Sequence, residues 1–320
     1  MAPKKYADMV KGTDKYGEQL RMAQRFPMDV QLRDMDEAGI DKAVLTGNPR
    51  WILRDCQVFN YEIAKWGKEH PDRFIGFAHA PPLGEEGLEE LDRAIKDLGF
   101  KGCMFRSNID FKLLDSPDFY PFYKKVEELD VPLFVHPASH PLYPHAVPAA
   151  LKKSVSEYEI SGSPGERRVR AYNISGGAGR EFDLIMAIVK LIDGGVLERF
   201  PNLNVVVSHL GGGIASILPR FYGSGGRDEE TRNAVEKSMK LFSRLYFDAA
   251  GNHGDVDALK CALIKISPKR IVFGTDCPPG GQMKGTTEIK RFIQDIQSLD
   301  ISDNDKQRIL GGNAAALLKI

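Results

Sequence analysis

The stretch Val131-Pro132-Leu133-Phe134-Val135-His136-Pro137 decides the fold class of this chain. It is a short apolar run that ends on one histidine and breaks at proline, a pattern typical of a parallel strand buried on both faces. Two later runs, Asn204 to Gly212 and Arg270 to Cys277, have the same shape and carry His209 and Asp276 at their ends. The carboxyl ends of parallel strands share one face, where α/β folds bind their ligands. We therefore expect the two histidines and the aspartate to converge on one pocket.

Strand-like and helix-like runs alternate along most of the chain. Four further strand-like runs lie at residues 42–46, 73–80, 102–106 and 245–249, with helical patterns between them. This alternation predicts parallel strands joined by right-handed crossovers. A length of 320 residues fits one α/β barrel of about 250 residues with insertions. We predict an α/β fold in a single domain over residues 1–320, whose last helix has Asn313 as its N-cap.

The alternation fails between Ala138 and Glu181, where prolines and glycines are frequent. Ordinary connections in compact domains are only about 4–6 residues long, and much longer ones usually serve a function. We interpret residues 138–181 as a lid over the carboxyl face of the strands.

The composition excludes several classes of partner. Apolar residues at 42% and charged residues at 28% are ordinary globular values. Lys plus Arg and Asp plus Glu balance at 44 each, so no charge excess favours nucleic acid or an anionic membrane. No apolar run approaches the ~18 residues of a membrane span, and Met1 is not followed by a secretory signal. The four cysteines form no Cys-x-x-Cys pair, which indicates reduced thiols and a cytoplasmic location.

The strand-end runs, taken with Gly195 to Pro201 and Gly311 to Ala314, resemble the amidohydrolase superfamily. The branch they resemble is the amidohydrolase-related one that includes aminocarboxymuconate semialdehyde decarboxylase. The resemblance extends from about Asp29 to the end of the chain, and the motifs are specific as an ordered set. It implies a distorted (β/α)8 TIM-like barrel with a divalent metal, zinc or manganese, at the carboxyl face. It also implies that His136 and Asp276 are metal ligands and that His209 is catalytic.

One motif of the resembled family has no counterpart here. The family's first strand ends in a His-x-His pair, whereas the first histidine of this chain is His70. The first strand is therefore missing or altered: either the chain lacks its natural start, or its site is altered or metal-free. The polar, strandless opening resembles the loop after the family's first strand and favours a lost start. Because two protein ligands are fewer than the three of catalytic zinc, we expect weak or absent metal binding.

Three more residues are candidates for binding a small carboxylate substrate. Arg106 ends the strand at 102–106, where its guanidinium suits a carboxylate, with a surface salt bridge as the alternative. Arg220 lies eleven residues after His209, a spacing that in the resembled decarboxylases belongs to an arginine reaching the neighbouring subunit's substrate. Since a helix rises about 1.5 Å per residue, the helix carries Arg220 well away from His209 of the same subunit. If Arg220 contacts substrate, it does so across a dimer interface, and we therefore expect a homodimer. Asp248 ends a strand and either lines the pocket or caps a helix.

The implied function is metal-dependent decarboxylation of an aromatic or unsaturated carboxylic acid. His209 would act as general acid or base because imidazole titrates near physiological pH. Asp276 would protonate the substrate carbon, or shuttle a proton in hydrolysis. Two alternatives stay open: a hydrolase of a lactone, ester or amide on the same fold, and a catalytically silent, metal-free scaffold or binding protein.

Overall fold

The computed structural model describes residues 28–47, 51–109, 112–138, 178–223, 228–250, 255–276 and 286–320. Seven strands form one sheet in which every strand pairs in parallel with the next one along the chain. They are β1 (Ala43–Leu45), β2 (Phe74–Ala78), β3 (Gly102–Arg106), β6 (Leu133–His136), β7 (Val205–Val207), β8 (Tyr246–Asp248) and β9 (Ile271–Val272). A doubly wound sheet reverses its strand order, whereas this unbroken order curls the sheet in one direction, as in a TIM barrel. The predicted distorted barrel is confirmed.

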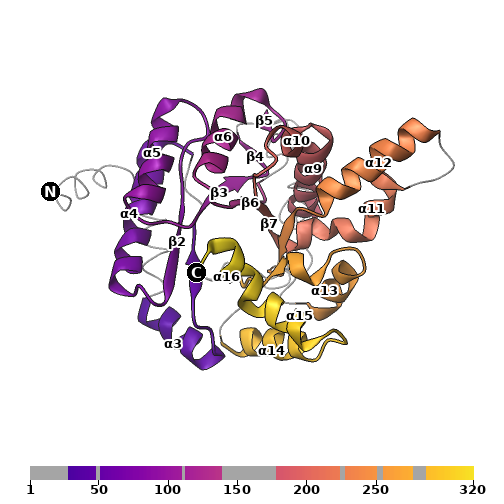
Figure 1. The fold of residues 1–320 in the computed structure, drawn as a ribbon. Coiled ribbons are helices and arrows are strands. Elements are labelled where there is room, and N and C mark those ends of the chain that lie inside the picture. Colours follow the sequence, from indigo (N-terminus) through magenta and orange to yellow (C-terminus); the bar gives the residue numbers. More distant parts are fainter. Residues whose placement is uncertain are drawn as a thin grey trace, which may run out of the picture.

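Most of the helices form a ring around the curled sheet, and α16 lies nearer the middle of the view (Figure 1). Helix α3 contacts α14, so that the ring passes across the gap between the edge strands β1 and β9. None of the described helices is long and apolar enough to span a membrane. The α-helices of the described residues are α3 (Met28–Ala38), α4 (Leu53–Glu69), α5 (Glu85–Lys96), α6 (Tyr120–Glu128), α9 (Arg180–Asp193), α10 (Val196–Arg199), α11 (Ile214–Tyr222), α12 (Glu229–Phe242), α13 (Val256–Leu263), α14 (Thr286–Gln297), α15 (Asp303–Gln307) and α16 (Asn313–Leu318).

The two faces of the sheet have different partners. In β6, Leu133 and Val135 are fully buried and belong to the core between the sheet and the helices. Phe134 and His136 alternate with them and face the inside of the curl. The register pairs Arg106 of β3 directly with His136, so that these two side chains share the inner face. The polar side chains of Arg106 and His136 therefore leave the inner face at the ends of their strands.

Some sequence predictions need correction or lie outside the described residues. Asn313 is not an N-cap: Gly312 holds that position. The Asn313 side chain instead donates to the carbonyls of Pro268 and Ile271, both at 2.7 Å, and ties the last helix to β9. The predicted lid falls largely on residues 139–177, which the structure does not describe. The missing or altered first strand would concern residues 1–27, which also lie outside the described residues. The short hairpin of β4 (Asn108–Ile109) and β5 (Lys112–Leu113) was not predicted.

Candidate active site

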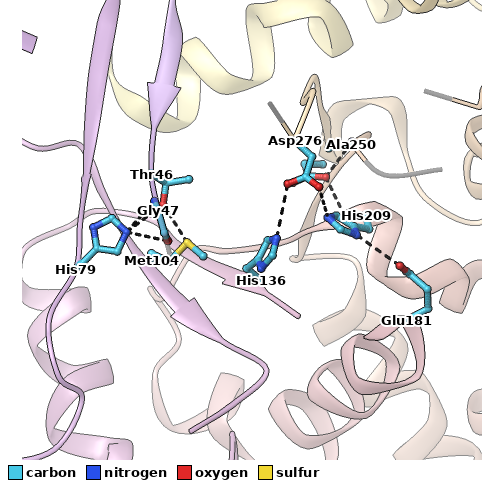
Figure 2. A network of polar contacts seen from close by, with 10 residues as sticks. Thr46, Gly47, His79, Met104, His136, Glu181, His209, Ala250 and Asp276 are labelled. Carbon is cyan, nitrogen blue, oxygen red and sulfur yellow. Dashed lines mark hydrogen bonds and ion pairs between the residues drawn. The ribbon is translucent and has the colours of Figure 1, made fainter. Parts of the chain in front are cut away.

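His136, His209 and Asp276 lie together at the carboxyl ends of β6, β7 and β9 (Figure 2). Nε2 of His136 lies 3.8 Å from Oδ1 of Asp276, and Nε2 of His209 lies 3.9 Å from Oδ2 of the same carboxylate. The two imidazole rings are perpendicular, with an interplanar angle of 89° and centroids 5.4 Å apart. The carboxylate is thus placed between two histidines that come from strands about 70 residues apart in the chain.

The backbone after β7 makes a left-handed turn that aims His209 into the site. His209 and Leu210 have φ values of +53° and +51°, and Gly211, Gly212 and Gly213 continue the turn at +65°, +67° and +77°. Such values are costly for residues with a Cβ and usually mark functional positions. The glycines lower this cost for the second half of the turn, which then leads directly into α11.

The second of these glycines also lets α9 approach the histidine. A Cβ on Gly212 would lie 2.1 Å from the carbonyl oxygen of Glu181, in the first turn of α9. Because that space is empty, the Glu181 side chain can reach His209, and its Oε1 lies 3.5 Å from Nδ1. The other ring nitrogen, Nε2, is buried and has no hydrogen-bond partner among the described residues. One ring nitrogen of His209 therefore faces Glu181, and the other faces Asp276 at 3.9 Å, which is beyond hydrogen-bond distance.

Asp248 supports this turn from the end of β8. Its Oδ1 accepts the backbone N–H of His209 at 2.8 Å and that of Ala250 at 2.9 Å. Burial raises the pKa of the Asp248 carboxyl to about 6, although the nearby charge of His209 and these N–H donors act in the opposite direction. The structure thus places this predicted substrate residue beside the cluster, with one carboxylate oxygen engaged by the backbone.

The two histidines have opposite tendencies to carry a proton. Burial lowers the pKa of His136 below its ordinary value, and the contact with Asp276 offsets only part of that effect. Burial also disfavours the charged form of His209, but the contact with Glu181 and the charges of Asp248 and Asp276 outweigh it and raise its pKa. At a given pH, His209 is therefore protonated more readily than His136.

The Asp276 carboxyl is held in its ionised form. Burial acts to raise its pKa, but the contact with His136 and the positive charges of His209 and Arg180 lower it overall. The Asp276 side chain is 29% exposed, whereas that of His209 is 3% exposed. Its backbone, at a φ of +52°, is strained in the same way as that of His209. An ionised carboxylate suits a metal ligand better than a proton donor.

The predicted arginines have different locations. Arg106 is half-buried next to His136, on the inner face of the sheet. Arg220 is exposed in the last turns of α11, outside the cluster around Asp276. A further arginine, Arg180, is the first residue of α9, and its charge acts on Arg106, His136 and Asp276.

A second polar group surrounds His79 at the end of β2 (Figure 2). His79 is fully buried, and its Nε2 accepts the backbone N–H of Gly47 at 3.0 Å. Asn60 accepts the backbone N–H of His79 and donates to its carbonyl, both at 2.8 Å. Burial lowers the pKa of the His79 ring to about 4 and keeps it neutral. These contacts indicate that His79 packs β2 against the segment after β1.

The donor atoms around Asp276 fit a divalent metal. One nitrogen of each histidine and one oxygen of the aspartate lie within 4.8 Å of one another. Metal–ligand bonds of about 2.0–2.2 Å bring donor atoms to roughly 3–4 Å of one another, so the cluster needs to contract only slightly. The buried, unpartnered Nε2 of His209 is a further sign that the site accommodates another group. The imidazole of His136 and the carboxylate of Asp276 are donor types that are common at zinc and also occur with other divalent metals.

The sequence matches one known protein family over most of its length. A family model described as amidohydrolase matches residues 6–320. The chain belongs to the amidohydrolase family. This amidohydrolase is 27% identical over 304 residues to a 2-amino-3-carboxymuconate-6-semialdehyde decarboxylase from Dictyostelium discoideum, with 91% of this chain and 76% of the relative covered. It is 25% identical over 312 residues to a 2-keto-4-carboxy-3-hexenedioate hydratase from Sphingobium, with 88% and 80% covered.

A solved structure agrees with the fold. A dihydroxybenzoic acid decarboxylase from Polaromonas, crystallised with manganese and the inhibitor 2-nitroresorcinol, superposes with a TM-score of 0.71. The two chains are 24% identical, and the match covers 96% of this amidohydrolase and 90% of that chain. This likeness shows that the distorted barrel is shared.

Arg180 and Glu181 are residues of this amidohydrolase's site that strand-end reasoning missed. They do not end a strand but begin the helix that follows the glycine-rich segment after β6. In barrels of this kind the helix after each strand begins near the carboxyl face. The signal was therefore a pair of charged residues at the point where the helical pattern resumes.

Proposed function

We propose that this amidohydrolase is a metal-dependent decarboxylase that acts on an aromatic or unsaturated carboxylic acid. The observation that carries the proposal is the pair of histidines that lie 3.8 Å and 3.9 Å from Asp276, of which His209 is the more readily protonated. A metal ligand must be neutral imidazole, and a proton donor must be imidazolium. The two side chains are thus suited to different tasks in one reaction.

His136 and Asp276 would hold the divalent ion. His136 is suited to this because it is neutral, and Asp276 because it is ionised. When bound, the ion supplies positive charge that orients and polarises the oxygen atoms of the substrate. The strained backbone at Asp276 and the strand end at His136 fix the two donor side chains before substrate arrives.

His209 would supply the proton that completes decarboxylation. When the bond between the substrate carbon and its carboxylate breaks, the electron pair stays on that carbon and carbon dioxide leaves. A proton must then reach the carbon, and His209 can donate it from Nε2, which faces the site. Glu181 lies 3.5 Å from Nδ1 and stabilises the imidazolium, and the ring recovers its proton from solvent. Asp276 is less suited to this donation because it is ionised.

The relatives support this reaction and name one alternative. Decarboxylases of an unsaturated amino acid and of a dihydroxybenzoic acid are among the proteins this chain resembles. A hydratase is also among them. Hydration of a carbon–carbon double bond likewise needs a proton on carbon, so the same His209 and Glu181 would serve it. Hydration differs in needing a water molecule activated as the nucleophile.

The proposal is tested by supplying manganese and a panel of hydroxybenzoates and unsaturated carboxylic acids, and measuring carbon dioxide release. Parallel incubations with lactones, and with unsaturated acids followed by absorbance, report hydrolysis and hydration. Carbon dioxide release that disappears in His209→Asn supports the proposal. Turnover of lactones alone, or release that is unchanged in His209→Asn, would refute it.

Three finer predictions accompany the proposal. Zinc and manganese both suit the donor set, and reconstitution with each metal would distinguish them. A homodimer agrees with the exposed Arg220 on α11, and light scattering of the purified protein tests it. Cytoplasmic location agrees with free Cys56, Cys103 and Cys261, and fractionation of the source cells tests it.

A further inference from the structure

Asp183 is a buried carboxylate that the proposed proton transfer does not use. It is the fourth residue of α9 and is 1% exposed. Removing a carboxylate from water is costly unless other groups donate hydrogen bonds to it or pair with its charge. The donors that surround Asp183 therefore indicate its role.

The ends of two strands supply hydrogen-bond donors to Asp183. The Ser107 hydroxyl donates to Oδ2 of Asp183, and Nδ2 of Asn108 lies 3.2 Å from each carboxylate oxygen. The backbone N–H of Ala138 lies 3.3 Å from Oδ2 and donates to the Ser107 hydroxyl oxygen at 2.7 Å. Ser107 and Asn108 follow β3, and Ala138 follows β6. One carboxylate thus ties the first turn of α9 to the carboxyl ends of both strands.

These contacts adjoin the residue that would bind the metal. Ala138 is two residues after His136. The backbone carbonyl of His136 accepts the N–H of Ser107 at 3.0 Å. The segment that carries His136 is therefore held at its carbonyl by Ser107, and two residues later by the Ser107 hydroxyl and Asp183.

The same turn of α9 also carries the residue that contacts the proton donor. Glu181 lies two residues before Asp183. Residues two apart in a helix point to different sides, since each residue turns the helix by about 100°. Glu181 accordingly contacts His209, with Oε1 3.5 Å from Nδ1, whereas Asp183 contacts the strand ends. The first turn of α9 is thus fixed to the strands on one side and reaches His209 on the other.

We infer that Asp183 is a positioning residue that fixes Glu181 and His209 relative to His136. Loss of its hydrogen bonds releases the first turn of α9 from the strand ends, so that Glu181 and Ala138 both move. The inference rests on the proposed function, since it takes His136 as the metal ligand and His209 as the proton donor. A residue that only stabilised the fold would affect stability and leave the two rings in place.

The test observes the two rings in metal-free protein, so that it depends on neither turnover nor metal binding. Asp183→Asn keeps the size of the side chain and replaces one acceptor oxygen by an NH2 group, which cannot accept from Ser107 or Ala138. With ¹⁵N-histidine labelling and NMR at fixed pH, we expect the ring signals of His136 and His209 both to shift.

Leu191→Ala is the matched control for a loss of stability without a loss of positioning. Leu191 is a fully buried residue of α9 that lies eight residues after Asp183, about 12 Å further along the helix. Its replacement removes core packing, and we expect both ring signals to stay in place. Shifts in Leu191→Ala equal to those in Asp183→Asn would overturn the inference.

Ser107→Ala is a second variant that keeps the inference testable if Asp183→Asn fails to fold. It removes the hydroxyl between Asp183 and Ala138, and it should shift the same two signals by a smaller amount. Unchanged ring signals in either variant that retains the wild-type circular dichroism spectrum would overturn the inference.

Turnover separates this inference from the proposed function. If the protein releases carbon dioxide, the kcat of Asp183→Asn should fall about 10–100-fold, as for other residues that orient a metal site, with KM little changed. An unchanged kcat would overturn the inference. Shifted ring signals in a protein that releases no carbon dioxide from any acid would refute the proposed function and leave the positioning of the two rings standing.

Discussion

Replacement of Gly212 by alanine tests how the left-handed turn positions the acid–base pair. The new Cβ would lie 2.1 Å from the carbonyl oxygen of Glu181, whereas an ordinary carbon–oxygen contact is roughly 3.3–3.6 Å. The first turn of α9 must therefore retreat by about 1.2–1.5 Å. Gly213→Ala is the matched control, because Gly213 has a similar φ of +77° and an added Cβ meets nothing within 4 Å.

Both variants lose stability through the left-handed alanine, and only Gly212→Ala also loses stability through overpacking. A left-handed alanine costs roughly 1–2 kcal/mol in both, and overpacking adds about 1–3 kcal/mol only in Gly212→Ala. Retreat of Glu181 removes the contact that does most to raise the pKa of His209, so we expect this pKa to fall in Gly212→Ala and to stay unchanged in Gly213→Ala. A misplacement of this size also costs about 100-fold in catalysis.

Urea unfolding and a histidine NMR titration measure these effects. Equal stability loss in the two variants, with the His209 pKa unchanged in both, would show that the close approach of Gly212 to Glu181 does not position the acid–base pair.

Three further predictions follow from single contacts. His136→Ala should weaken manganese binding by at least about tenfold in isothermal titration, because it removes a ligand, and unchanged affinity would contradict its assignment. Asp248→Ala should lower the free energy of unfolding by about 2–4 kcal/mol in urea, because the backbone N–H groups of His209 and Ala250 lose their acceptor. His79 has a folded pKa of about 4, below its ordinary 6.5, so the unfolded chain binds more protons between these values and stability falls as pH falls. Between pH 7 and pH 4.5 this effect lowers the free energy of unfolding of the wild type by roughly 2–3 kcal/mol. Urea unfolding at the two pH values should show a decrease that is smaller by that amount in His79→Gln, and an equal decrease in the two proteins would refute the prediction.

The strand framework was predictable because its signal is local. Runs such as Leu133 to Val135 are apolar on both faces, and they end at a histidine followed by proline. Since parallel strands align their carboxyl ends, the convergence of His136, His209 and Asp276 followed from the order of strands alone.

The remaining parts of the site depend on contacts that no local pattern reveals. Glu181 is placed by the absence of a Cβ on Gly212, which lies 31 residues further along the chain. Asp248 ends a strand as predicted, but the direction of its Oδ1 toward the N–H of His209 depends on the left-handed turn. The error at Asn313 has a similar cause, since a residue favoured at helix caps is used here to bind two distant carbonyls.

The assignment of a ligand to His136 and of a proton donor to His209 can be measured directly. In metal-free protein labelled with ¹⁵N-histidine, the two rings are assigned by single substitutions and titrated by NMR. We predict that the pKa of His209 lies above the ordinary histidine value, because Glu181 contacts its ring. We predict that the pKa of His136 lies below that value, because burial has the largest effect on its ring. Titration in the opposite order, or at the same pH, would contradict the division of roles on which the decarboxylase proposal rests.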